Sequence, residues 1–262
     1  QWIADREAVT EEDKDLLPLR GVMKQCGLDE TEQLIIIFLL MPEISVSCNK
    51  LYGMILQKRR ENYITVGFLY ELLQYVKEIT ACELLEYLQP DRPLAKYCIE
   101  TEIGTEIVDF NTPVQLRANL IRYASGRDAA AAGKDRVFYY INEEKEIYAF
   151  DDYVERFERI ICYGESKEAV VVLKGKTYSG RKSCLRKLGA KLGRRVLYID
   201  FDRMCQAGQK GYWHLRNLIL TEIRLQEPIL YVSGIESTAE DKKHRAADFI
   251  SELLEYTKVV FT

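Results

Sequence analysis

The chain has 262 residues, of which 47% are hydrophobic and 30% charged, with a formal net charge of −4. This length and composition fit one large globular domain or two smaller ones. The longest apolar run, residues 34–41, is too short to span a bilayer and no leader-like stretch precedes it, so we expect no membrane segment and a cytoplasmic protein. Seven irregularly spaced cysteines without a CxxC pair, and only two histidines, argue for reduced thiols and against a metal site.

The charge is unevenly distributed along the chain. Residues 1–126 carry 13 lysines and arginines against 20 acidic residues, a balance of −7, and the remainder carries 24 against 21, a balance of +3. An acidic N-terminal half is a poor electrostatic match for nucleic acid. We therefore expect a protein partner there, and not nucleic acid.

The N-terminal half predicts helices and one hairpin. Residues up to about 20 are charged and expected at the surface. A helix is expected over 29–41, ended by Pro42, and others are expected over 49–59, from Thr65, and from the capping-box pair Thr80 and Glu83.

Two extended segments, 94–103 and 106–110, are predicted next, with Gly104 between them. The pair Thr112-Pro113 then predicts the start of a helix that ends at Gly126. Helices, a hairpin and another helix indicate a mostly α domain of winged-helix type over residues 1–126.

The C-terminal half predicts an α/β domain. Residues 127–165 are expected to hold a linker with the alanine run 129–132, which is either a native linker or a place of unidentified side chains. A hairpin (137–140 and 147–150) and a helix capped by Asp151 or Asp152 follow. From residue 166 to 262 strands alternate with helices, which indicates a parallel sheet covered on both faces. The expected strands are 169–173, 196–200, 229–232 and 258–261, and the expected helices are 181–192, 213–225 and 245–256. Because a strand rarely ends a domain uncovered, we expect the sequence to be part of a longer chain.

A glycine-bounded loop at 175–180 follows the strand 169–173 and nearly fits the P-loop pattern of Gly, four residues, Gly, Lys and Ser or Thr. Arg181 stands where lysine should reach the phosphates, and Lys182 stands where a hydroxyl should hold Mg²⁺; shifting by one residue restores Lys182-Ser183 but breaks the loop spacing. Such a loop can bind an anion through its amides and the helix N-terminus. The alternative is an ordinary α/β loop without a ligand. The candidate nucleotide-binding residues are Gly175, Ser179, Gly180, Arg181, Lys182 and Ser183.

A hydrolysing P-loop domain also needs an apolar strand that ends in Asp, often followed by Glu. Strand 229–232 is instead followed by Ser233 and Gly234, so we expect no catalytic residue and no Mg²⁺ site in this domain. ATP or ADP is expected to bind weakly or without metal, if it binds. Three acids lie near strand ends, and each has two possible roles. Asp200 and Asp202 are either ligand groups or helix caps. Glu236 is either a ligand group or a solvated carboxylate.

Two basic clusters each have two interpretations. The first lies at the glycine loop and the helix that follows it. It would either attract a phosphate or pack against an acidic face of a neighbouring subunit or of the N-terminal domain. Its members are Lys176, Arg181, Lys182, Arg186 and Lys187. The second, Lys58-Arg59-Arg60, fits a small nucleic-acid contact or a solvated helix end, and the surrounding acidity favours the helix end.

The order of P-loop-like turn, strand ending in Asp, second-motif strand and final strand resembles the large subdomain of an AAA+ ATPase. Residues 39–44, 51–57 and 93–96, together with Gly180-Arg181-Lys182, also resemble a bacterial AAA family with a winged-helix region. The resemblance covers most of residues 28–262. It implies a degenerate first ATPase domain followed by an intact one beyond this sequence, and some members are associated with contractile, phage-tail-like injection systems.

These observations support three hypotheses. The first is the N-terminal part of an AAA+ ATPase that remodels or disassembles a protein assembly, with a non-hydrolysing ATPase-like domain, a protein partner for the N-terminal domain and a homo-oligomeric assembly. The second is a winged-helix DNA-binding regulator with a nucleotide-sensing P-loop domain. The third is a competent ATPase that uses Lys182 in the shifted register.

Overall fold

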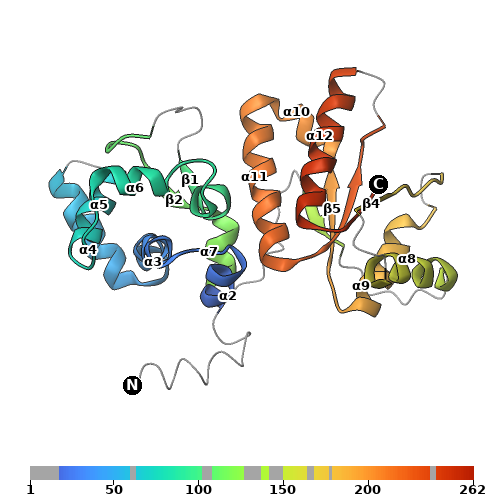
Figure 1. Ribbon diagram of the computed structural model, residues 1–262, viewed down its shortest axis with the longest axis horizontal. Helices are drawn as coiled ribbons and strands as arrows, with labels where there is room; N and C mark the ends of the chain where they lie inside the picture. The colour runs from blue at the N-terminus through green and yellow to red at the C-terminus, as the bar shows by residue number, and fades with distance from the viewer. Residues whose placement is uncertain are drawn as a thin grey trace, which may run out of the picture. The chain divides into compact units, whose positions relative to one another are not determined.

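The structure is a computed structural model that describes residues 18–59, 63–101, 108–126, 137–141, 150–163, 168–176, 179–236 and 240–262 (Figure 1). The chain divides into two compact units, Gln1–Ala129 and Ala130–Thr262. The first is mostly helical and the second is α/β. The finer division predicted above, with a separate connecting segment over 127–165, stays a prediction.

The N-terminal unit consists of short helices around one small sheet. Its elements are α2 (Pro18–Gln25), α3 (Glu30–Ile44), α4 (Val46–Arg59), α5 (Val66–Gln74), α6 (Ala81–Tyr87), the π-helical turn η1 (Leu94–Cys98), β1 (Ile99–Thr101), β2 (Val114–Leu116) and α7 (Ala118–Ala124). The predicted starts of α3, α5 and α6 are confirmed, because Asp29, Thr65 and Thr80 are their N-caps. Helix α2 was not predicted, although its residues Val22 and Met23 are buried.

The prediction that Pro42 ends the first long helix is wrong, since α3 continues to Ile44. Proline has no N–H to donate to the carbonyl four residues earlier, which is that of Phe38. The hydroxyl of Tyr52, on α4, donates to this carbonyl oxygen at 3.1 Å. The neighbouring helix therefore supplies the hydrogen bond that proline removes.

The predicted hairpin is only partly correct. Strand β1 pairs antiparallel with β2, with Ile99 opposite Leu116, whereas the predicted partner segment 106–110 forms no strand over its described residues 108–110. Phe110 and Thr112 instead accept hydrogen bonds from the first backbone N–H groups of α5, from Gly67 N at 2.8 Å and from Val66 N at 3.0 Å. The predicted helix start at Thr112-Pro113 is also wrong, because α7 begins at Ala118.

The buried Arg117 separates β2 from α7. Its guanidinium donates to the backbone oxygens of Ala95, Lys96 and Ile99 at 2.8 to 3.1 Å. These contacts hold η1 and the start of β1 against the beginning of α7. A buried cation is tolerated here because several carbonyl oxygens satisfy it.

The C-terminal unit contains a five-stranded sheet in the order β3-β5-β6-β7-β4, in which β3 runs antiparallel to β5 and the other pairings are parallel. Its elements are β3 (Phe138–Tyr140), α8 (Asp151–Tyr163), β4 (Ala169–Val171), α9 (Arg181–Leu192), β5 (Val196–Asp200), α10 (Phe201–Gln206), α11 (Gly208–Gln226), β6 (Ile229–Ser233), α12 (Glu240–Tyr256) and β7 (Val259–Phe261). The predicted partner of β3 in a hairpin, residues 147–150, lies outside the described residues except for Phe150. Helix α10 was not predicted.

Helices cover both faces of this sheet (Figure 1). On one face, Leu197, Leu230 and Val260 form a core with α10, α11 and α12. On the other face, Val196, Tyr231 and Phe261 form a core with α8 and α9. The connection from β4 to β5 crosses the positions of β7 and β6, and the chain then returns through β6 and β7 in the opposite direction. Because both kinds of connection are right-handed, the helix of the first lies on one face of the sheet and the helices of the return lie on the other. The predicted α/β class with a mostly parallel sheet is confirmed.

In the described residues, no single helix is long and apolar enough to cross a membrane. Helices α3 and α4, over residues 30–57, reach the length and apolar composition of a membrane span only when taken together, and they are bent by 103° relative to each other.

Candidate functional site

The glycine loop connects the end of β4 to the first turn of α9. After β4, Leu173 N donates to Thr262 O at 2.7 Å and so extends the pairing of β4 toward the loop. A Cβ on Gly175 would lie 2.6 Å from the Oγ and 3.0 Å from the Cβ of Ser179, so the two ends of the loop lie close together. Residues 177–178, at the loop tip, lie outside the described residues.

Gly180 is the N-cap of α9 and is required there for two reasons. Its φ of 83° lies in the left-handed region, and a Cβ would lie 2.5 Å from the Cζ of Phe150. Phe150 itself has a φ of 78°, an uncommon conformation for a bulky residue. An aromatic ring therefore packs directly on the point where the loop becomes a helix.

The predicted site residues lie together at this end of α9, but their basic side chains contact the protein itself. Arg181 donates from its guanidinium to the backbone oxygen of Leu173 at 3.3 Å. The Lys182 ammonium donates to the hydroxyl of Tyr139 at 2.6 Å and lies 3.7 Å from the ring centroid of Tyr198. Ser183 is half-buried in the same turn.

The ring system that holds Lys182 is part of a row that the sequence analysis did not predict. Tyr139, Tyr198, Tyr231 and Phe261 occupy the same register position on four neighbouring strands. The rings of Tyr139 and Tyr198 are 4.8 Å apart, and those of Tyr198 and Tyr231 are 5.5 Å apart. Burial raises the pKa of Tyr231, and the positive charges of Arg181 and Lys182 offset only part of this effect. The sequence does contain a signal for this row, because a tyrosine stands in the middle of two apolar strands, in Leu197-Tyr198-Ile199 and in Leu230-Tyr231-Val232.

The positions expected to carry the second motif lie at the end of β6. The Ser233 hydroxyl donates to the Tyr198 hydroxyl at 2.5 Å, so it contacts the aromatic row. Gly234 has a φ of 77°, and a Cβ there would lie 3.0 Å from the backbone nitrogen of Asp202. Glu236 is exposed.

The two acids after β5 have structural partners. Asp200 caps α10 by accepting from the backbone nitrogen of Arg203 at 3.1 Å, which confirms the interpretation as a helix cap. Asp202 forms an ion pair with Lys242 at 3.5 Å. Among the described side chains, no group of three or more His, Cys, Asp or Glu residues is placed to hold a metal ion.

The basic face of α9 meets an acidic helix of the same unit. Lys187 pairs with Asp151 at 2.7 Å, and Lys191 pairs with Glu158 at 2.6 Å, both on α8. The hydrogen bond from Lys191 to Glu158 raises the pKa of Lys191. Part of the basic cluster therefore stabilises the packing of α8 on α9, a partner that the sequence analysis did not consider.

The N-terminal unit presents an apolar surface, here called the α3–α4 face. Its α3 members are spaced by four and three residues and so lie along one side of that helix. Each member is at least 36% exposed. The face comprises Ile37, Met41 and Ile44 on α3, and Val46, Leu51 and Met54 on α4. The side chains of Lys58 and Arg59, and residue Arg60, lie outside the described residues.

A comparison with protein families identifies the N-terminal unit. Residues 1–128 match the family model described as winged helix domain, variant. No curated protein and no solved structure matches the chain. The mostly helical N-terminal unit thus carries a winged-helix domain.

Proposed function

We propose that this chain is the adaptor and non-hydrolysing part of an AAA+ ATPase that remodels or disassembles a protein assembly. In this proposal the winged-helix domain docks a protein, and the α/β unit is a degenerate P-loop domain that serves a homo-oligomeric assembly. The order of loop, helices and parallel strands supports the AAA+ resemblance. The contractile injection systems associated with some AAA relatives enter the proposal through that resemblance alone.

The contacts of Lys182 carry the non-hydrolysing part of the proposal. A P-loop lysine acts by reaching the β- and γ-phosphates, and the next hydroxyl acts by holding Mg²⁺. Here the ammonium is held by Tyr139 and Tyr198, and the residue at the expected Asp position, Ser233, is hydrogen-bonded to the same Tyr198. Lys182 therefore does not provide the hydroxyl that holds Mg²⁺, and Ser233 does not provide the carboxylate.

The loop still offers groups for an anion. The α9 N-terminus presents backbone N–H groups and the positive end of a helix dipole. The proposed ligand is ATP or ADP, held weakly or without metal by Gly175, Ser179, Gly180, Arg181, Lys182 and Ser183. For that, Arg181 would exchange its contact with Leu173 for a phosphate oxygen.

The α3–α4 face supports a protein partner for the winged-helix domain. Its six members are all uncharged and exposed on two consecutive helices, and exposed apolar patches mark protein interaction sites. A DNA-binding surface instead needs lysine and arginine placed on phosphates. The balance of −7 over residues 1–126 opposes DNA further.

Calorimetric titration of the chain with ATP and with ADP, each with and without Mg²⁺, tests the nucleotide part. We expect binding that is insensitive to Mg²⁺ and weakened by Arg181→Ala, with no phosphate release. Mg²⁺-dependent turnover that Lys182→Ala abolishes would establish a competent ATPase and overturn the proposal. If no binding is detected at millimolar nucleotide, the proposed nucleotide ligand is wrong and the glycine loop has only a structural role.

Fluorescence anisotropy with a labelled DNA duplex tests the adaptor part. We expect no shift even at low salt, because the exposed face is apolar and the unit acidic. Affinity that falls steeply with salt would instead support the DNA-binding regulator.

A further inference from the structure

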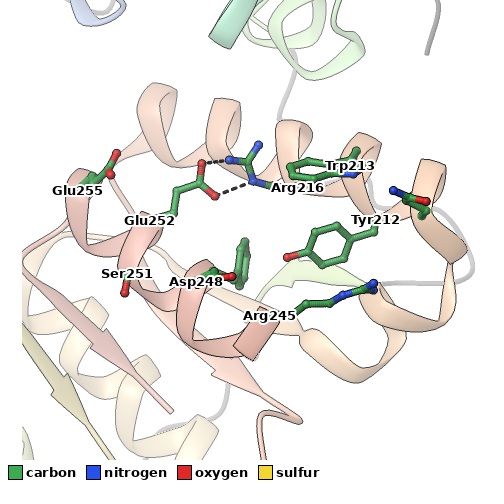
Figure 2. A pocket seen from close by; sticks show the side chains of 10 residues that line it. Tyr212, Trp213, Arg216, Arg245, Asp248, Ser251, Glu252 and Glu255 are labelled. Carbon is green, nitrogen blue, oxygen red and sulfur yellow. Dashed lines mark hydrogen bonds and ion pairs between the residues drawn. The ribbon is translucent and has the colours of Figure 1, made fainter. Parts of the chain in front are cut away.

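Helices α11 and α12, which pack on the opposite face of the sheet from α9, form a groove of about 450 Å³ (Figure 2). One wall consists of Tyr212, Trp213 and Arg216, which are spaced to lie on one side of α11. Phe249 of α12 forms the base, because it is 1% exposed and stacks on Phe201 at a centroid distance of 5.7 Å.

An ion pair across the groove holds the two helices in place. The Arg216 Nε donates to the Glu252 carboxylate at 2.6 Å, and a second nitrogen of the same guanidinium donates to its other oxygen. The Arg216 guanidinium also lies 4.8 Å from the ring of Trp213 (Figure 2). The aromatic wall is therefore fixed before any ligand arrives, which reduces the entropy lost on binding.

The remaining charges of the groove are arranged by sign along α12. Arg245 lies near its start, followed by Asp248 and then Glu255 toward its end. All three side chains are exposed, and within the described residues none of them forms an ion pair. Glu255 lies ten positions after Arg245 on the helix, a span of about 15 Å.

The groove combines the features of a protein-binding hot spot. Tryptophan, tyrosine and arginine carry most of the binding energy in protein interfaces. Trp213, in the wall of the groove, remains 47% exposed. The exposed side chains along both helices leave the groove too open to enclose most of a small molecule, as ligand pockets do. Its carboxylates also oppose nucleic-acid phosphates.

We propose that this groove docks a peptide segment of a partner protein in which an acidic residue, an apolar residue and a basic residue follow one another. The acid faces Arg245, the apolar side chain packs on Tyr212, Trp213 and Phe249, and the base faces Asp248 and Glu255. The order of charges sets the direction of the segment. This site does not depend on the glycine loop or on the α3–α4 face.

Selection of a random 12-residue peptide library displayed on phage against the whole chain tests the site. Peptides are retained when they bind the wild-type chain and not the Trp213→Ala variant. Their affinities are then measured by the fluorescence of Trp213 in a Trp2→Phe background, since these are the two tryptophans of the chain. Thermal melting of each variant shows that it is folded.

We expect retained peptides with the order acid, apolar, base. Arg245→Glu should weaken their binding about tenfold or more, which is the scale of a lost charge contact near a hot spot. The matched control Lys243→Glu changes the same charge on the same helix outside the groove and should leave affinity within about twofold.

Several results would overturn the proposal. They are no enrichment over Trp213→Ala, peptides without the charge order, and peptides whose affinity Arg245→Glu leaves unchanged. Sedimentation provides a further test: if the wild-type chain self-associates and Trp213→Ala abolishes it, the occupant is a second copy of the chain and not a partner.

Discussion

Replacing Lys182 with methionine separates a structural cation from a phosphate ligand. Methionine keeps the length of the side chain but removes both its charge and its hydrogen bond. The ammonium lies 3.7 Å from the Tyr198 ring centroid, and an exposed contact of this kind contributes about 0.5–1 kcal/mol. The hydrogen bond to Tyr139, at 2.6 Å, contributes about 0.5–1.5 kcal/mol. Because Lys182 is exposed, we expect a total loss of about 1–2 kcal/mol in the free energy of unfolding of the α/β unit.

Urea unfolding followed by Trp213 fluorescence in a Trp2→Phe background reports on this unit. With a slope of about 2 kcal/mol/M, the midpoint should fall by roughly 0.5–1 M. Lys176→Met, which removes an exposed lysine from the same loop, is the matched control and should leave the midpoint unchanged. An unchanged midpoint in Lys182→Met would refute the structural role and leave Lys182 as a phosphate ligand only.

Three further substitutions test local features. Tyr52→Phe should lower the free energy of unfolding of the N-terminal unit by about 1–2 kcal/mol, because the carbonyl of Phe38 loses its donor. Urea unfolding followed by circular dichroism measures this loss, and a change below about 0.3 kcal/mol would contradict the prediction. Gly180→Ala should cost about 2 kcal/mol or more, since it combines a φ of 83° with a 2.5 Å approach to Phe150, and unchanged thermal melting would show that the ring moves freely. Hydrogen bonds from the backbone and hydroxyl of the α6 N-cap lower the pKa of Glu83, so its contribution to stability is present above the ordinary carboxyl range and is lost as pH falls through the lowered value. Wild-type and Glu83→Gln melting curves should therefore converge in acid, and a constant difference down to low pH would refute this.

Local signals predicted much of the fold. Asp29, Thr65 and Thr80 begin helices because their side chains accept from backbone N–H groups three residues later, a rule that needs no tertiary information. The alternation of strands and helices after residue 166 likewise predicted the mostly parallel sheet. Both signals come from residues close together in the sequence.

The errors arose where distant residues decide the structure. Residues 106–110 were predicted as a strand, but the carbonyl oxygen of Phe110 accepts from the backbone N–H of Gly67 in α5. For the candidate site, sequence placed Arg181 and Lys182 at the start of α9 but gave no information on where their side chains point. Tyr139, which holds Lys182, lies 43 residues earlier in the chain.

The hydrogen bond from Tyr52 to Phe38 has a consequence for how this chain can vary. Tyr52 is needed as a donor only because Pro42 cannot be one, so the two residues form one unit although they lie on different helices. Pro42→Ala would return a backbone donor to the Phe38 carbonyl, and Tyr52→Phe should then cost little. Sequences of related chains should accordingly change both positions together: where position 42 is not proline, position 52 is free to lose its hydroxyl.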